Sequence, residues 1–238
     1  MAGPASLTVS GAPEGFDAQL VLKEAANGGV IHVARDDKRM AAMASALRFF
    51  APEMPVLMFP GWDCLPYDRV SPNADISATR MATLATLVHG GPSEFVLLTT
   101  LGAAMQRIPP RDVLREAAFS AQVNQQIDEA ALRAFLVRMG FVQSPTVTEP
   151  GDYAVRGGII DIFPPGPGGP VRLDLFGDVL DGIRRFDPAT QRTTAQLQAI
   201  ELAPVSEVIL DDAGITRFRQ NYRIEFGAAG TDDPLYEA

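Results

Sequence analysis

The order in which apolar patterns follow one another constrains the fold of this chain more than any other feature of its sequence. In the first half, short apolar runs typical of strands alternate with stretches of helical spacing. Such alternation predicts a parallel sheet covered by helices. After about Arg115, one helical stretch at 128–139 is followed by a run of strand patterns, which predicts a small α+β domain. We therefore expect an α/β protein with two kinds of domain.

The periodicity and the turn residues between the patterns predict the individual elements. Strands are expected at 6–9, 30–34, 56–59, 95–99, 118–125, 142–148, 153–163, 171–176 and 182–186, and helices at 17–26, 36–50, 75–88, 128–139 and 211–226. We place the first part of an α/β domain at 1–117 and the small α+β domain at 118–205. Residues 206–238 are expected to be a helical segment that returns to the first domain and is truncated.

Composition limits the classes of partner that the chain can bind. The 238 residues carry a net charge of −9, which argues against DNA or a membrane surface as the main partner, because phosphate binding depends on basic side chains. A single cysteine, Cys64, excludes an intramolecular disulfide and fits a reducing compartment. No leader-like N-terminus and no apolar run long enough for a bilayer are apparent, so we expect a cytoplasmic protein.

The loop at 10–17 retains glycines but lacks the chemistry of a nucleotide site. A Walker loop needs Lys and Ser/Thr directly after its last glycine, whereas Phe16 and Asp17 follow Gly15 here, and Pro13 removes a backbone donor. We therefore predict no ATP binding at this loop.

No other motif predicts catalysis or a bound metal. With two distant histidines, His32 and His89, and one cysteine, the sequence offers no zinc spacing, and no serine-hydrolase elbow is present. Asp174, Asp178 and Asp181 are interpreted as a solvated strand end and turn rather than paired catalytic acids. We predict no catalytic residue, no cofactor and no metal in this chain.

The stretch 151–187 contains the clearest candidate for a binding surface. Because side chains alternate along a strand, Leu173 and Leu175 share one face, and Arg172 and Phe176 share the other. An aromatic beside an arginine on a polar face is typical of a protein-binding hot spot. The alternative is an ordinary hairpin with one exposed phenylalanine.

Two motifs in this stretch carry a family resemblance. A-V-R-G-G at 154–158 and V-R-L-D-L-F at 171–176 resemble the module shared by the transcription-repair coupling factor (Mfd) and the excision-repair protein UvrB. In those families the module binds the excision-repair protein UvrA. The run F-P-G-W-D-C-L-P-Y-D-R-V-S-P at 59–72, with the arginine-bearing helix after it, is similar to the coupling factor in particular, and 105–109 and 186–192 also fit. The resemblance covers nearly the whole chain and corresponds to the N-terminal part of that multidomain family.

The resemblance implies a fold and a site. The fold would be a degenerate RecA-like, P-loop-type parallel-sheet domain with the small α+β domain inserted, and the 10–17 loop would be the relic of a nucleotide site. The partner-binding residues carried over are Arg156, Arg172 and Phe176. We expect the arginines to meet partner carboxylates and Phe176 to be the apolar anchor. We also expect a glycine bulge at Gly157 and Gly158 to aim Arg156 at the shared face, and all three side chains to be exposed.

The implied function is a non-enzymatic recruitment module that binds UvrA to bring nucleotide excision repair to stalled RNA polymerase. The ATP- and magnesium-dependent motor, and the contacts with polymerase and DNA, would lie outside these residues. An alternative is a UvrB-like ATPase on damaged DNA, which the missing Walker lysine and the short path from Tyr67 to the next helix disfavour. We expect Trp62 to pack that loop onto the sheet rather than to stack on bases. An unrelated α/β enzyme with an unrecognised site also stays open.

Overall fold

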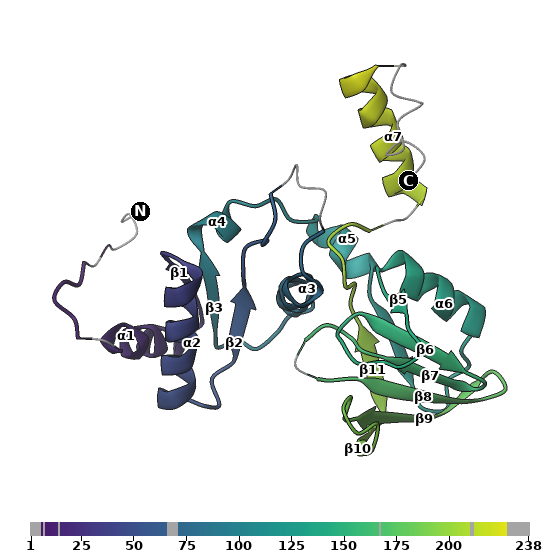
Figure 1. The fold of residues 1–238 in the computed structure, drawn as a ribbon. Coiled ribbons are helices and arrows are strands. Elements are labelled where there is room, and N and C mark those ends of the chain that lie inside the picture. Colours follow the sequence, from purple (N-terminus) through teal and green to yellow (C-terminus); the bar gives the residue numbers. More distant parts are fainter. Residues whose placement is uncertain are drawn as a thin grey trace. The chain divides into compact units, whose positions relative to one another are not determined.

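The computed structural model describes residues 6, 8–13, 15–65, 71–166, 168–209 and 212–227. The chain forms two compact units (Figure 1). Unit 1 comprises Met1–Pro72 and His89–Arg107, and unit 2 comprises Asn73–Val88 and Ile108–Ala238. Both units mix helices and strands, so the α/β class is confirmed at that level.

Unit 1 is built on a three-stranded parallel sheet in the order β1-β3-β2. Its elements are α1 (Phe16–Ala25), β1 (Gly29–Ala34), α2 (Asp37–Phe50), β2 (Val56–Phe59), β3 (Phe95–Thr100) and α4 (Leu101–Ala104). Helices α1 and α2 cover one face of the sheet, where Met43 and Leu47 pack against Leu98. Helix α2 begins where the sequence predicts, because the Asp36 side chain accepts a hydrogen bond of 2.8 Å from the Arg39 N–H.

Unit 2 contains a six-stranded sheet in the order β10-β9-β8-β7-β6-β5, antiparallel except for the short β5–β6 pair. Its strands are β5 (Val142–Gln143), β6 (Asp152–Arg156), β7 (Ile159–Ile162), β8 (Val171–Phe176), β9 (Val179–Phe186) and β10 (Thr193–Leu197). A second, two-stranded sheet pairs β4 (Phe119–Gln122) with β11 (Ala199–Leu202). The helices are α3 (Ala74–Val88), α5 (Arg111–Glu116), α6 (Glu129–Arg138) and α7 (Asp212–Phe226).

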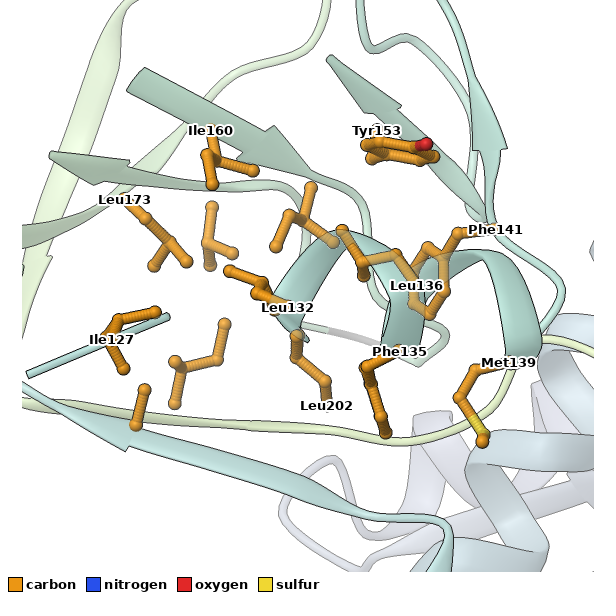
Figure 2. Packing of buried hydrophobic residues seen from close by; sticks show 14 of the residues in the cluster. Ile127, Leu132, Phe135, Leu136, Met139, Phe141, Tyr153, Ile160, Leu173 and Leu202 are labelled. Atoms are coloured by element: carbon orange, nitrogen blue, oxygen red, sulfur yellow. The ribbon is translucent and has the colours of Figure 1, made fainter. Parts of the chain in front are cut away.

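The core of unit 2 lies between α6 and one face of the six-stranded sheet. Leu132 and Leu136 of α6 are buried in the same cluster as Ile160 and Leu173 of the sheet (Figure 2). Asp128 starts α6 by accepting hydrogen bonds from the two N–H groups at positions 130 and 131, at 2.9 and 3.1 Å. The opposite face of the sheet is therefore the one on which polar side chains gather.

The structure corrects several expectations about elements. The parallel sheet predicted for the first half has only three strands. The two-stranded sheet is antiparallel, and the six-stranded sheet is antiparallel except for β5 and β6. The described residues of 6–9 form no strand, and of the strand expected at 142–148 only β5 forms. Short elements that carry little periodicity, α4, α5, β10 and β11, were not predicted. The domain boundaries near 117 and 205 stay predictions, although α3 groups with unit 2.

The expected strand at 153–163 is in fact the hairpin of β6 and β7. Arg156 pairs with Ile159, so Gly157 and Gly158 form a two-residue turn and not the predicted bulge. Gly157 has a φ of +61°, which glycine adopts without the cost that a side chain would add. Arg156-Gly157-Gly158 interrupts the apolar pattern here, and two glycines between apolar runs are also typical of a hairpin turn, so the sequence signal was present but was interpreted as a bulge.

Candidate partner-binding face

Strand register places the charged side chains of β6, β7, β8 and β9 on one face of the sheet. Asp161 pairs with Arg172, and Arg172 in turn pairs with Arg184, so these three side chains point the same way. Arg156 lies two residues from Ala154, the partner of Asp161 on β6, and shares that face. This surface, which we call the charged face, lies opposite the face that α6 covers.

Asp161 is the centre of the charged face. Its side chain is 0% exposed, and it accepts hydrogen bonds from Arg172 Nε at 2.6 Å and Arg172 Nη2 at 2.8 Å. Arg156 Nη2 donates a further hydrogen bond to the same carboxylate. The hydrogen bonds with Asp161 are the main reason that the pKa of Arg172 is raised above its usual value, so this guanidinium stays charged.

The two arginines differ in how much solvent they meet. Arg172 is 18% exposed, and its guanidinium carbon lies 4.8 Å from the centre of the Phe186 ring, a cation–π distance. Arg156 is 49% exposed. The expectation that all three site residues are exposed is therefore wrong for Arg172, because Asp161 and Phe186 hold it against the sheet.

A second ion pair extends the charged face toward β9 and β10. Arg184 donates to Asp174 through Nε at 2.8 Å and Nη2 at 2.6 Å. Beside this pair is a cavity of about 450 Å³, lined mainly by polar groups that include Asp181 and Gln196. Asp181 is the extra residue where the β8–β9 register shifts, so it stands outside the ladder.

Phe176 lies at the end of β8 and is 83% exposed, which makes it a large apolar side chain in water. By alternation it shares the face of Arg172, about 13 Å away along the strand. Leu173 is 0% exposed and Leu175 packs against the α6 core, as the sequence predicts for the other face. The structure thus brings Arg156 and Arg172 together at one carboxylate and leaves Phe176 free at the edge of the same face.

The sequence contains a signal that Asp161 belongs to the charged face, although the sequence analysis did not include this residue in the site. Asp161 is the one acidic residue in the apolar run I-I-D-I-F at 159–163, and its strand position matches that of Arg172. An acid in a buried strand requires a charged partner. Arg80 of α3 is a second buried ion to which the sequence pattern assigned no role, and it pairs with Glu207.

The glycine-containing loop before α1 adjoins an ion pair and a small cavity. Asp17 in the first turn of α1 lies 3.8 Å from Arg39, and the adjoining cavity of about 150 Å³ is small for a nucleotide. Trp62 is half-buried, and its backbone N–H donates to Gln106 Oε1 at 3.3 Å. Glu14, Tyr67 and Arg69 lie outside the described residues.

In the part of the chain that the structure describes, no three His, Cys, Asp or Glu side chains gather where they could hold a metal ion. Among the same residues, no helix is long and apolar enough to cross a membrane.

Comparison with known proteins identifies the relatives of both units. Residues 119–208 match the family model of the UvrB interaction domain. The transcription-repair-coupling factor of Escherichia coli is 34% identical over 213 residues, which are 88% of this chain. Those of Haemophilus influenzae and Myxococcus xanthus are 34% identical over 87% of the chain and 38% identical over 77% of it.

This chain is a homologue of the transcription-repair-coupling factors over most of its length. It spans only 16–18% of the length of these three relatives. Arg156, Arg172 and Phe176 all lie inside the segment that matches the UvrB interaction domain. The homology to transcription-repair-coupling factors therefore includes the charged face.

Proposed function

We propose that the chain is a non-enzymatic recruitment module that binds the excision-repair protein UvrA and so brings nucleotide excision repair to stalled RNA polymerase. One observation carries this proposal. The UvrB interaction domain presents, on one sheet face, two arginines held at Asp161 and a phenylalanine that is 83% exposed. A charged cluster next to a solvent-exposed aromatic is the composition of a protein-binding hot spot.

The chemistry of the face indicates the chemistry of the partner surface. Arg156 is the more accessible guanidinium, and it offers donors to a carboxylate on the partner. Phe176 offers an aromatic ring for an apolar pocket. Arg172 contributes mainly through the part of its guanidinium that faces away from Asp161. We therefore expect acidic groups on UvrA opposite the arginines and an apolar pocket beside them.

The remainder of the proposal concerns the larger protein. Unit 1 is taken as a degenerate RecA-like domain without a nucleotide, cofactor or metal, and residues 118–205 as the domain that binds UvrA. The ATP-driven motor and the contacts with RNA polymerase and DNA would belong to other parts of a coupling factor, acting in the cytoplasm. The relatives are about five times as long as this chain, which leaves room for such parts.

A calorimetric titration of the purified chain with purified UvrA tests the proposal. We expect saturable binding, and we expect Phe176→Ala or Arg156→Ala to weaken it by about 2 kcal/mol, roughly 30-fold. Phe49→Ala is a matched control, because Phe49 of unit 1 is 81% exposed and lies outside the matched domain.

The melting temperatures of Phe176→Ala and Phe49→Ala should equal that of the parent, since both side chains are exposed. Arg156→Ala should melt only slightly lower, because Arg172 still pairs with the buried Asp161 carboxylate. Parent-like affinity in both Phe176→Ala and Arg156→Ala would show that UvrA binds elsewhere. No binding by the parent would refute the proposed function itself.

A further inference from the structure

We infer that Asp161 is a positioning residue of the charged face: its buried carboxylate holds Arg156 and Arg172 as one rigid pair for binding partner carboxylates. The inference rests on the proposed function. Asp161 itself is 0% exposed, so it is not a contact residue but acts through the two arginines.

The position of Asp161 in the sheet explains why it can hold both arginines. Strand β7 lies between β6 and β8, and Asp161 pairs with Ala154 on one side and Arg172 on the other. Arg172 reaches it directly across the ladder, and Arg156 reaches it diagonally from the end of β6. A single carboxylate therefore accepts three hydrogen bonds from two strands.

The stability of the fold does not by itself explain a buried carboxylate at position 161. Burying a carboxylate costs free energy that its ion pairs only partly return, and apolar replacements of buried ion pairs are often neutral or stabilising. On its own face of the sheet, Asp161 pairs with the buried Ala154, and the buried Phe186 lies against Arg172, so apolar side chains are already present beside this site. What an apolar residue at 161 would lose is the fixed orientation of the two guanidinium groups.

The hydrogen bonds define which donors remain for a partner. Asp161 takes the Nε–Nη2 edge of Arg172, and the Phe186 ring lies against the same guanidinium. Within the described part of the chain, Nη1 of Arg172 and both Nε and Nη1 of Arg156 carry no hydrogen bond to another residue. These donors belong to a cluster of two guanidinium groups and one carboxylate with a net charge of +1. The ligand that such a cluster fits is a carboxylate on the partner surface.

The affinity of Asp161→Asn for UvrA distinguishes positioning from simple charge attraction. Removing the Asp161 charge makes the face more positive, which by itself would favour an acidic partner. If orientation matters more, Asp161→Asn binds more weakly, because the arginines must then be ordered at the moment of binding. We expect a loss of about tenfold in affinity, since two long side chains are released.

Glu129→Gln is the control for the loss of a carboxylate charge. Glu129 forms an ion pair of 2.8 Å with Arg133 on α6, the helix that covers the opposite face of the sheet. Positioning by Asp161 predicts that Glu129→Gln binds UvrA within about threefold of the parent.

The experiment combines titration of UvrA with a double-mutant cycle. Arg156→Ala should cost less affinity in the Asp161→Asn background than in the parent, because Arg156 is already disordered there. Equal losses from Asp161→Asn and Glu129→Gln, or additive effects of Asp161→Asn and Arg156→Ala, would overturn the inference. Parent-like binding by a folded Asp161→Asn variant would do the same.

The mobility of the arginine side chains in the unmodified chain provides a second test, which does not require Asp161→Asn to fold. Nitrogen relaxation of the arginine Nε–H groups should show Arg156 and Arg172 to be rigid, and the exposed Arg138 at the end of α6 to be mobile. If Arg156 is as mobile as Arg138, the carboxylate does not hold it and the inference is wrong. This measurement needs no partner, so its outcome is independent of whether UvrA binds.

Discussion

Replacing Glu207 with glutamine removes one charge of the ion pair that fastens α3 to the chain after β11, and we expect a large loss of stability. The Arg80 side chain is 0% exposed and that of Glu207 is 8% exposed. Arg80 donates from Nε to Oε1 of Glu207, and from Nη2 to Oε2 at 3.2 Å. Both charges are therefore withdrawn from water and oriented toward each other.

The size of the effect follows from this burial. Breaking a buried ion pair by removing one partner costs about 3–5 kcal/mol, because the other charge loses a counterion inside the protein. Glutamine keeps one acceptor oxygen, so we expect the lower value of about 3 kcal/mol. For a unit of roughly 150 residues, about 4 °C per kcal/mol predicts a fall in melting temperature of about 12 °C.

Thermal melts followed by circular dichroism measure the change, with urea unfolding as the second probe. Asp112→Asn is the control, since its ion pair with Arg115 is on the surface and should contribute nothing measurable. A double variant, Arg80→Leu with Glu207→Leu, should recover part of the loss because both charges of the buried pair are removed together. A Glu207→Gln variant that melts within about 2 °C of the parent would refute the reasoning.

The remaining predictions concern pH and nucleotide binding. Burial lowers the pKa of His32 below 6.5, with Asp17 opposing the shift, so the unfolded state binds more protons below pH 6.5 and stability should fall as the pH drops from there. His32→Gln should flatten that slope in urea unfolding between about pH 7.5 and 5.5, and an unchanged slope would assign it to other groups. A fluorescent ATP analogue with magnesium should show no saturable binding, because Phe16 and Asp17 stand where a Walker loop needs Lys and Ser/Thr. Saturable micromolar binding would revive the ATPase alternative.

Local chemistry explains why many elements were predictable. Helices α2 and α6 start at Asp36 and Asp128, whose side chains cap them, and both helices have apolar residues at helical spacing. Strand β2 has the bounds that its apolar run predicts. The hairpin of β6 and β7 was missed, because Gly157 and Gly158 fit either a bulge within one strand or a turn between two, and only the pairing of Arg156 with Ile159 decides between them.

By itself, the sequence determined the local pattern in which the candidate binding residues lie. Alternation along β8 put Arg172 and Phe176 on the same face, and the motif around Arg156 pointed to the same module. Alternation is a property of neighbouring residues on one strand, so it needs no knowledge of the rest of the chain.

Only the tertiary structure decided which charges are buried and which are free. Arg172 meets Asp161 because β7 and β8 are adjacent, and Arg80 meets Glu207 although 127 residues separate them. The exposure of an arginine depends on whether the fold brings a carboxylate to it. That depends on long-range pairing, which the spacing of residues along one strand or helix does not encode.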